Sequence, residues 1–257
     1  MSALLEVDQV SRRFGGLYAL RNVTFSVAEG EIVGLIGPNG AGKTTCFNVV
    51  SGTVAPSAGT VRFRGHDISG RKPSAIVALG LVRTFQATTL FPAATVFENV
   101  MRGAFSRTLA SPLGSVFNTR AARAAIGASE ERCARLLERL GLAPFREQLA
   151  AELPYGHQRR LGVAIALAAQ PQLLMLDEPV AGLNPEESAE MGRLIRDVHE
   201  SEKVTVLLVE HHMRLVMGIC DRIVVLDHGE KIAEGLPTEI RADRKVIEAY
   251  LGTEDVA

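Results

Sequence analysis

No tryptophan occurs in this 257-residue chain, and cysteine occurs only three times. The cysteines, Cys46, Cys133 and Cys220, lie far apart without a C-x-x-C pair, so neither a disulfide framework nor a zinc site is predicted. No apolar run approaches the roughly 20 residues of a membrane span, and the acidic stretch 1–8 lacks the basic start of a signal peptide. We therefore expect a reduced, cytosolic protein that reaches a membrane only by docking onto other subunits.

An excess of charge of one sign is also missing. The formal net charge is -1, which argues against a generally basic nucleic-acid-binding protein. Between Met101 and Ala150, eight arginines stand against four glutamates, and we interpret this local surplus as a solvated face. We therefore expect no nucleic-acid partner. The length allows one large domain or two small ones, with a sizeable core in either case.

The stretch 37–45 matches the phosphate-binding pattern G-x-x-x-x-G-K-[ST] at every position. An apolar run precedes it and a helical pattern follows, which is the strand–loop–helix context that the pattern requires. Its glycines allow backbone N–H groups to converge on an anion, and the helix adds its positive dipole end. Lys43 can reach the β- and γ-phosphates, and the Thr44 hydroxyl can ligate Mg²⁺. The predicted nucleotide-binding residues are Gly37, Pro38, Asn39, Gly40, Ala41, Gly42, Lys43, Thr44 and Thr45.

A second polar site is predicted where the apolar run 173–176 ends in Asp177 and Glu178. Ligands of open α/β sheets bind at the carboxyl ends of the strands. There Asp177 can hold Mg²⁺ or one of its waters, and Glu178 can polarise an attacking water. Two acids after a strand usually cap the next helix, but the matched phosphate loop favours the functional interpretation.

The remaining patterns predict alternating strands and helices, with a mainly helical stretch between residues 97 and 170. In that stretch Ser129, followed by two glutamates, is the expected start of a helix that Gly141 ends. The expected strands are 4–10, 22–27, 31–36, 60–63, 81–85, 173–176, 204–209, 222–226 and 231–233. The other expected helices are 44–50, 73–80, 186–200 and 244–251. This order predicts a mostly parallel α/β core with a helical insertion and β-rich edges at both ends.

Over essentially its full length the chain resembles the ATP-binding cassette (ABC) ATPases. The segment 152–160 opens a predicted helix, and its Gly156 precedes Asp177 by 21 residues, which places it at the L-S-G-G-Q signature of that family. The other motifs match in order: Phe14 for the aromatic that stacks on adenine, Gln86 for the Q-loop, 181–184 for the D-loop and His211 for the switch histidine.

The resemblance implies a P-loop NTPase (RecA-like) core of the α/β class, with an antiparallel β subdomain and an inserted α-helical subdomain. The chain is then a single ABC transporter ATP-binding domain, 1–257, with the helical subdomain at about 87–168 and a family-specific tail at 235–257. In this family two cassettes pair head to tail, so each ATP lies between one P-loop and the signature helix of the partner. Membrane permeases insert coupling helices at a cleft that begins at the Q-loop. The implied location is the cytoplasmic face of the inner membrane, as a peripheral subunit.

Residue roles follow from the resemblance position by position, with ATP and Mg²⁺ as cofactors and ATP hydrolysis as the activity. Glu178 activates water, His211 contacts the γ-phosphate, and Thr44, Gln86 and Asp177 surround the metal. The implied catalytic set is Lys43, Gln86, Glu178 and His211. The signature residues that face the partner's ATP are Leu153, Pro154, Tyr155, Gly156 and His157.

The signature departs from the family pattern at three positions. Pro154 stands where serine is usual, Tyr155 replaces a glycine, and His157 replaces glutamine. Proline suits a helix start, so the fold need not suffer. It removes a hydroxyl that would bond the γ-phosphate, and a hydrogen bond to a charged group is worth about 1.5–3 kcal/mol. Losing it from the transition state alone would slow hydrolysis roughly tenfold to a hundredfold. We hypothesise that a different partner cassette supplies the standard signature in a heterodimer.

Three local features resemble the larger ATP-binding subunit of branched-chain amino acid importers. They are the R-T-F-Q approach at 83–86, the tyrosine before the glycine in 155–160, and the tail 235–252. Importers of this group combine two cassettes, two permeases and a periplasmic or lipid-anchored solute-binding protein. The resemblance thus implies uptake of branched-chain or related hydrophobic amino acids.

Two alternatives remain open at this point. A homodimeric ATPase of a lipopolysaccharide-type exporter shares much of the pattern, and the altered signature also fits a catalytically weak, ATP-sensing cassette. A chromosome-maintenance ATPase would need a long coiled coil, and a translation factor of the cassette type would carry two P-loops. Neither feature occurs in the sequence. The transported solute is not readable from this subunit, because selectivity resides in the permeases and the binding protein.

Overall fold

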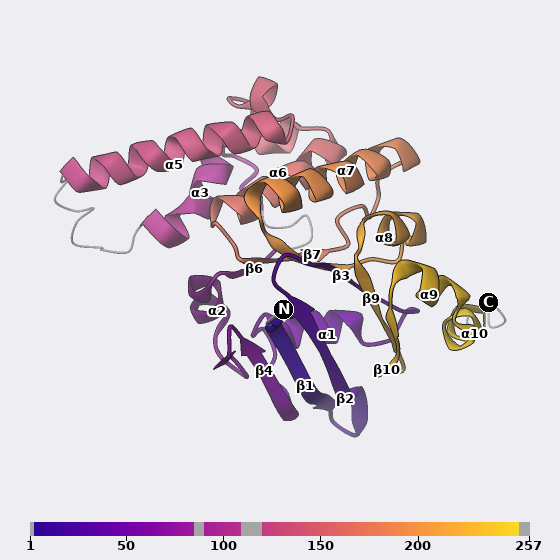
Figure 1. Cartoon of the computed structure of the whole chain (residues 1–257). Helices are drawn as coiled ribbons and strands as arrows, with labels where there is room; N and C mark the ends of the chain where they lie inside the picture. Colours follow the sequence, from indigo (N-terminus) through magenta and orange to yellow (C-terminus); the bar gives the residue numbers. More distant parts are fainter. Residues whose placement is uncertain (1–2, 85–89, 109–119, 252–257) are drawn as a thin grey trace.

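The computed structural model of the chain describes residues 3–84, 90–108 and 120–251 (Figure 1). Its strands are β1 Ala3–Phe14, β2 Leu17–Ala28, β3 Ile32–Ile36, β4 Ala58–Phe63, β5 His66–Asp67, β6 Leu81–Arg83, β7 Leu173–Asp177, β8 Thr205–Val209, β9 Arg222–Asp227 and β10 Glu230–Gly235. Its α-helices are α1 Lys43–Val50, α2 Pro73–Leu79, α3 Val96–Thr108, α5 Arg120–Arg139, α6 Tyr155–Ala168, α7 Pro185–Glu202, α8 Met213–Ile219, α9 Pro237–Ala242 and α10 Arg244–Leu251. Two short 3₁₀ helices, Ala143–Phe145 and Ala150–Glu152, precede α6.

A central sheet has the strand order β10-β9-β3-β8-β7-β6 within these residues, and all its pairs but β10–β9 are parallel. Each of β3, β7 and β8 is buried over all five residues. Continuous apolar runs are expected for such strands, because helices and a second sheet cover both faces of a parallel sheet. The parallel α/β core predicted from these runs is confirmed.

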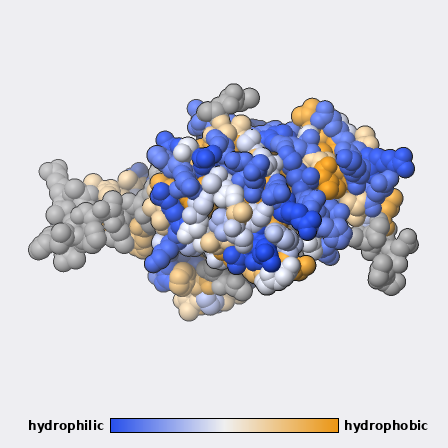
Figure 2. Space-filling view, turned by 90° about the horizontal axis from the view of Figure 1, so that it is seen from below, coloured by the Kyte–Doolittle hydropathy of each residue, from blue (hydrophilic) through white to orange (hydrophobic). Residues whose placement is uncertain are grey.

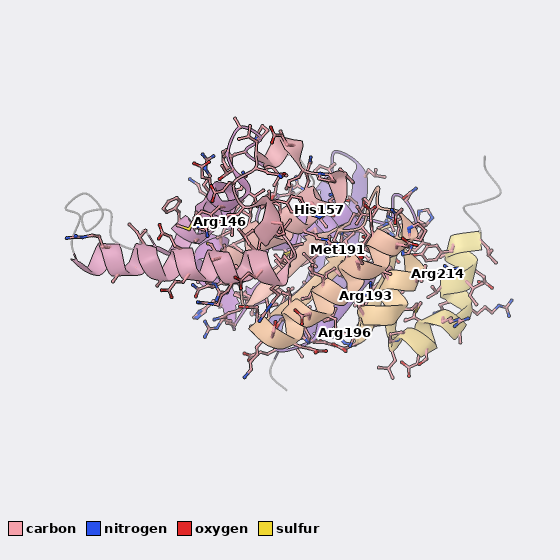
Figure 3. The ribbon with its side chains drawn as sticks, turned by 90° about the horizontal axis from the view of Figure 1, so that it is seen from above. Arg146, His157, Met191, Arg193, Arg196 and Arg214 are labelled. Carbon is pink, nitrogen blue, oxygen red and sulfur yellow. The ribbon has the colours of Figure 1, made fainter. Side chains whose placement is uncertain are left out.

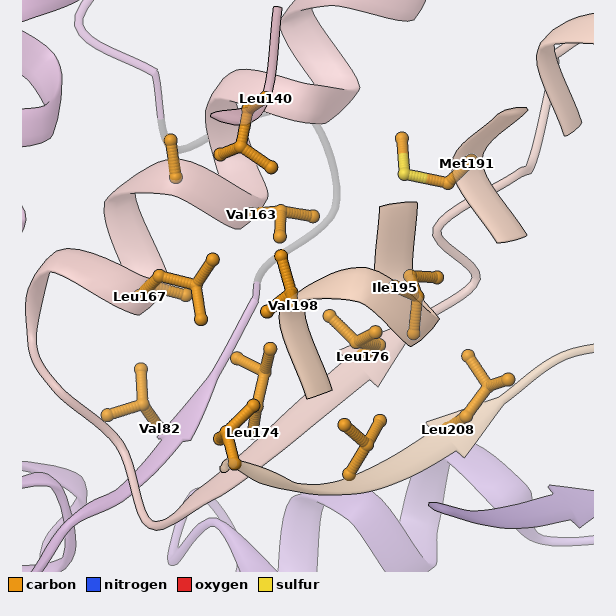
Figure 4. Packing of buried hydrophobic residues seen from close by; sticks show 14 of the residues in the cluster. Val82, Leu140, Val163, Leu167, Leu174, Leu176, Met191, Ile195, Val198 and Leu208 are labelled. Atoms are coloured by element: carbon orange, nitrogen blue, oxygen red, sulfur yellow. The ribbon is translucent and has the colours of Figure 1, made fainter. Parts of the chain in front are cut away.

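Alternate residues of these strands enter two different hydrophobic clusters, as the two-residue period of a strand requires. Leu174, Leu176 and Leu208 point to the side of α6 and α7, where Val163, Leu167, Ile195 and Val198 meet them (Figure 4). Met175 and Leu207 point to the opposite side, into a cluster with Phe47 of α1. The sheet therefore anchors the helices on one face and the P-loop helix on the other.

A second, antiparallel sheet has the order β2-β1-β4-β5 and packs on the α1 side of the core (Figure 1). β1 and β2 are longer than predicted and form a hairpin in which Phe14 pairs with Leu17 across Gly15-Gly16. The predicted strands stopped earlier because the residues at the hairpin end, Phe14, Leu17 and Tyr18 among them, are exposed, so no alternation of apolar and polar residues marks this part of the strands. On the face shown in Figure 2, hydrophilic residues predominate and hydrophobic ones form small, separate areas.

Helices α3, α5 and α6 pack against one another beside the central sheet. Helix α5 buries an apolar face, because Cys133, Leu136, Leu137 and Leu140 lie in the core cluster. The predicted start at Ser129 is wrong, because α5 already begins at Arg120. The Ser129 hydroxyl instead donates to Ala125 O at 3.0 Å, a bond that serine can make inside a helix in place of a cap.

The C-terminal residues form β10, α9 and α10 beside β9. Helix α10 matches the predicted range 244–251, whereas α8 and α9 had not been predicted. Both missed helices are short, at seven and six residues, so they carry too few turns for a periodic pattern. Among the described residues no helix has the length and apolar composition to cross a membrane.

Candidate functional site

The P-loop connects the carboxyl end of β3 to α1, as its sequence context predicted. Gly40 and Gly42 have φ angles of 80° and 98°, a region that residues with a Cβ rarely occupy. There is also no room for a side chain at Gly37 or Gly42. A Cβ on Gly37 would stand 2.0 Å from Leu226 O, and one on Gly42 would stand 2.6 Å from Ala19 O. These glycines are therefore required by the close approach of β9 and β2 to the loop.

Lys43, the first residue of α1, is buried and points back into the loop. Its Nζ donates to Gly37 O at 2.7 Å and to Pro38 O at 2.9 Å. Burial lowers the pKa of Lys43, and the negative charge of Glu178 opposes that shift. The loop thus holds an ammonium group where its backbone curls, and Glu178 lies close enough to act on it electrostatically.

Asp177 ends β7 and forms a buried ion pair with Arg83, a residue that the sequence analysis had not placed in the site. Arg83 Nη2 lies 2.6 Å from Asp177 Oδ2, and the two side chains are 9% and 7% exposed. Arg83 Nη1 also donates to Asn48 Oδ1 at 2.7 Å, so one guanidinium bridges the end of β7 and the middle of α1. The sequence did contain a signal for this ion pair: Arg83 ends a short strand whose other residues are apolar, and a buried cation usually has a partner of opposite charge.

Glu178 follows in an uncommon backbone conformation, with φ of 46°. Its N–H donates to Val209 O at 2.9 Å, which holds the residue at the end of β8. The His211 Nδ1 lies 3.8 Å from Glu178 Oε1. The structure therefore brings together the predicted catalytic acid and the predicted switch histidine, from segments 33 residues apart in the chain.

Glu210 is a further residue of this site that sequence analysis missed. Its carboxylate is fully buried and accepts hydrogen bonds from Val180 N at 3.0 Å, His211 N at 3.1 Å and His212 N at 3.3 Å. A buried carboxylate needs such donors, because burial without them is costly. Glu210 thus joins the turn after Glu178 to the segment that bears His211. An acid at the end of the apolar run 204–209 was the available signal.

The signature residues lie at the start of α6, with Pro154 as its N-cap. Leu153 and Gly156 are buried, whereas Tyr155 is 42% exposed. A Cβ on Gly156 would stand 3.1 Å from Glu187 Oε1 of α7, so the signature glycine lies against the helix that follows the D-loop. The predicted signature and D-loop are therefore neighbours within one chain.

His157 packs its ring edge-on against Phe145, with ring centroids 4.7 Å apart. Burial and the charge of Arg160 lower the pKa of His157, and Glu187 and Glu190 oppose the shift. Figure 3 shows His157 on the helical side of the molecule, together with Arg146 and Met191. The environment of His157 thus favours a neutral imidazole.

Acidification is expected to destabilise the chain through His157. In the folded chain the pKa of His157 lies below its ordinary value of 6.5, so the unfolded chain binds a proton at this residue more readily. Protonation therefore does not affect the free energy of unfolding well above pH 6.5, and it lowers that free energy as the pH falls from 6.5 toward the pKa of the folded chain. His157→Gln should therefore lose less thermal stability than the unsubstituted chain between about pH 7.5 and 5.5. Melting temperatures measured across this range check the expectation, with His228→Gln at an exposed turn as the control. Parallel losses in the chain and both variants would contradict it.

Two predicted site residues, Phe14 and Gln86, are not among those that the structure places beside Glu178. Phe14 ends β1 and is exposed, with the Arg12 guanidinium 4.5 Å above its ring centroid. The same hairpin reaches the P-loop through Ala19, whose carbonyl faces Gly42. Gln86, the predicted Q-loop residue, lies outside the described residues. Lys43, Asp177, Glu178 and His211 are the predicted residues that the structure gathers at one edge of the sheet.

A family model for the ABC transporter matches residues 20–181. The high-affinity branched-chain amino acid transport ATP-binding protein LivG of Salmonella typhimurium is 45% identical over 249 residues, covering 97% of this chain and 98% of the relative. This chain belongs to the ABC transporter family. Its membership confirms the predicted resemblance, the P-loop NTPase fold class and an ATP-hydrolysing activity.

Other members of the family agree in fold and length. A solved ATP-binding cassette of an ABC transporter in its ADP conformation superposes with a TM-score of 0.85 and 30% identity, over 98% of this chain and 100% of that one. The lipopolysaccharide export system ATP-binding protein LptB of Acidithiobacillus ferridurans is 35% identical over 254 residues, 99% of each chain. Of these two curated proteins, the branched-chain amino acid transport protein LivG is thus more similar to this chain than the lipopolysaccharide export protein LptB.

A second family model, for the branched-chain amino acid ATP-binding cassette transporter, matches residues 230–256. The described part of that segment forms β10, α9 and α10. Burial raises the pKa of Tyr250 on α10, and the nearby backbone of Gly37 acts in the opposite direction. The C-terminal segment of this ABC protein therefore contacts its P-loop.

Proposed function

We propose that this chain is the ATP-binding and ATP-hydrolysing subunit of an importer for branched-chain or related hydrophobic amino acids. The observation that carries the proposal is the C-terminal segment, because residues 230–256 match the model for that transporter group. The identity of 45% to a branched-chain amino acid transport protein over nearly the full length supports it. The segment packs beside β9 and contacts the P-loop at Gly37, so it is an integral part of this domain.

For ATP binding we assign the phosphates to the P-loop 37–45 and its Lys43, and the adenine ring to Phe14. The N–H groups at the start of α1 and the ammonium of Lys43 supply the positive field that phosphates need. Lys43 now bonds two carbonyls of its own loop, Gly37 O and Pro38 O. Phosphate oxygens would replace these two carbonyls as hydrogen-bond acceptors. The free-energy cost of this exchange is small, because the Lys43 ammonium already lies inside the loop.

The residues present fit a magnesium ion, which prefers oxygen ligands. Thr44 of α1 supplies a hydroxyl and Asp177 of β7 a carboxylate, and Arg83 keeps the two elements together by bonding both Asn48 and Asp177. We assign Thr44, Asp177 and Gln86 to the metal. When bound, Mg²⁺ neutralises charge on the phosphates.

For hydrolysis we assign Glu178 as the group that accepts a proton from the attacking water, and His211 as the donor to the γ-phosphate. The Glu178 and His211 side chains are both partly exposed, and Glu178 Oε1 lies 3.8 Å from the His211 ring nitrogen. Glu210 fixes both segments through their backbone N–H groups. Positioned acid–base groups of this kind contribute about 10²–10⁴-fold to a reaction rate.

For the assembly we propose a heterodimer with a second ATP-binding subunit, bound below two membrane permeases at the cytoplasmic face of the inner membrane. A solute-binding protein, periplasmic or lipid-anchored, delivers the amino acid to the permeases. Pro154 carries no hydroxyl for the partner's γ-phosphate, and no side chain caps the first turn of α6. The weaker of the two composite sites is therefore the one that this signature completes.

Uptake of radiolabelled leucine tests the proposal in cells that lack this chain. We expect uptake to be lost and to return with the unsubstituted gene, but not with Glu178→Gln. Unchanged leucine uptake, together with a homodimer and a defect in lipopolysaccharide export, would instead establish the exporter function of the relative from Acidithiobacillus ferridurans. Restored transport with Glu178→Gln would favour the ATP-sensing alternative.

A further inference from the structure

The first turn of α6 is tied to the segment after β7 by two side chains, which we call the Tyr155–Arg159 clamp. The Tyr155 hydroxyl donates to Ala181 O at 3.1 Å. Arg159 Nη2 donates to the same carbonyl at 3.1 Å and also to the Tyr155 hydroxyl. The Arg159 guanidinium lies 4.9 Å from the Tyr155 ring centroid, so charge and ring attract each other.

The ring of Tyr155 also fills the space against Gly182. Gly182 has a φ angle of 80°, and a Cβ there would stand 2.9 Å from Tyr155 Cε1 and 3.3 Å from the hydroxyl oxygen. Glycine at 182 therefore allows both the backbone turn and the approach of the ring. Tyr155, which replaces a glycine of the usual signature, here has a specific partner in the D-loop.

The carbonyl that the clamp holds is one hydrogen bond away from the proposed catalytic acid. Ala181 N donates to Glu178 O at 3.1 Å, and Leu183 N donates to Val180 O at 3.0 Å. Val180 N donates to the buried Glu210 at 3.0 Å. The turn 178–183 is thus held by Glu210 on one side and by the clamp on the other.

We propose that Tyr155 and Arg159 are positioning residues that transmit movement of the signature helix to Glu178. This inference rests on the proposed function, in which the start of α6 faces the partner's ATP while Glu178 faces the chain's own. Closure of α6 over the partner's nucleotide then pulls on Ala181 O and aligns the turn that carries Glu178. The clamp thereby couples hydrolysis at one composite site to nucleotide occupancy at the other.

Hydrogen exchange in the isolated chain tests the contact without the transporter. Tyr155→Phe keeps the ring against Gly182 but removes the hydroxyl, and Arg159→Gln removes the charge. We expect faster amide exchange at residues 180–183 in both variants. Arg160→Gln is the matched control, because Arg160 lies on the same helix and bonds Glu190 of α7 instead. Exchange equal to that of the control would overturn the clamp.

Steady-state ATP hydrolysis in the complete transporter tests the coupling. We expect Tyr155→Phe and Arg159→Gln to lower kcat about fivefold, the effect of losing one ordinary hydrogen bond in the transition state, with ATP affinity unchanged. The Hill coefficient for ATP should fall toward one, which loss of stability alone would not cause. A normal kcat and Hill coefficient, despite faster exchange at 180–183, would overturn the coupling. If the unsubstituted complex hydrolyses no ATP, the proposed function itself fails, and the exchange data still report on the contact.

Discussion

Replacing Glu178 with Gln is expected to lower the rate of ATP hydrolysis by at least about 10²-fold while ATP still binds. Gln has the shape of Glu but cannot accept the proton of the attacking water. The P-loop and Lys43, to which we assign the phosphates, are left intact by this substitution. The carboxylate of Glu178 is partly exposed and lies 3.8 Å from the His211 ring nitrogen, so it is open to solvent beside the other residue that we assign to hydrolysis.

Single-turnover hydrolysis and equilibrium nucleotide binding, measured on the chain with its partner cassette, check this expectation. Glu186→Gln serves as the control, because Glu186 lies exposed in the first turn of the next helix and makes the same change of charge. Hydrolysis within a few-fold of the unsubstituted protein would show that another group activates the water. Loss of ATP binding would show that Glu178 instead shapes the nucleotide pocket.

Replacing Arg83 with Met is expected to lower the free energy of unfolding by about 3–5 kcal/mol, because Asp177 is then left buried without its cation. The ion pair is almost fully buried, and the same guanidinium also bonds Asn48. Pairing Arg83→Met with Asp177→Leu should recover part of the loss, since two apolar residues leave no buried charge.

Urea denaturation of the isolated chain measures both effects. Arg244→Met is the matched control, because Arg244 pairs with Glu248 on the exposed surface of α10 and such pairs contribute little. If Arg83→Met changed the unfolding midpoint no more than this control, the buried pair would not be the link between β7 and α1. A double variant less stable than Arg83→Met would also contradict it.

The strongest sequence signals were those in which one residue type is required by local geometry. The glycines of the P-loop and the apolar runs of β3, β7 and β8 each predicted the element that the structure contains. The order of these elements predicts Lys43 and Asp177 at the same edge of a parallel sheet. Local chemistry was sufficient there.

The residues that sequence analysis missed act through partners far away in the chain. Arg83 ends the apolar strand β6 and Glu210 directly follows β8, and a pattern of hydrophobicity does not tell which buried donor or acceptor each of them will meet. Tyr155 looked like a departure from a motif, whereas its function depends on a carbonyl 26 residues later, at Ala181. At Ser129 a local rule was misleading. The rule predicts a helix start there, but Ser129 lies inside the longer helix α5 and its hydroxyl donates to Ala125 O.

ATP hydrolysis by the isolated chain, compared with an equimolar mixture of this chain and its partner cassette, measures whether its P-loop site needs another subunit. We predict slow turnover alone, faster turnover in the mixture, and a gain of roughly tenfold or more in the isolated chain after Pro154→Ser, which restores a hydroxyl to the signature. Brisk turnover by the unsubstituted homodimer, without further increase from the partner or from Pro154→Ser, would contradict the asymmetric dimer.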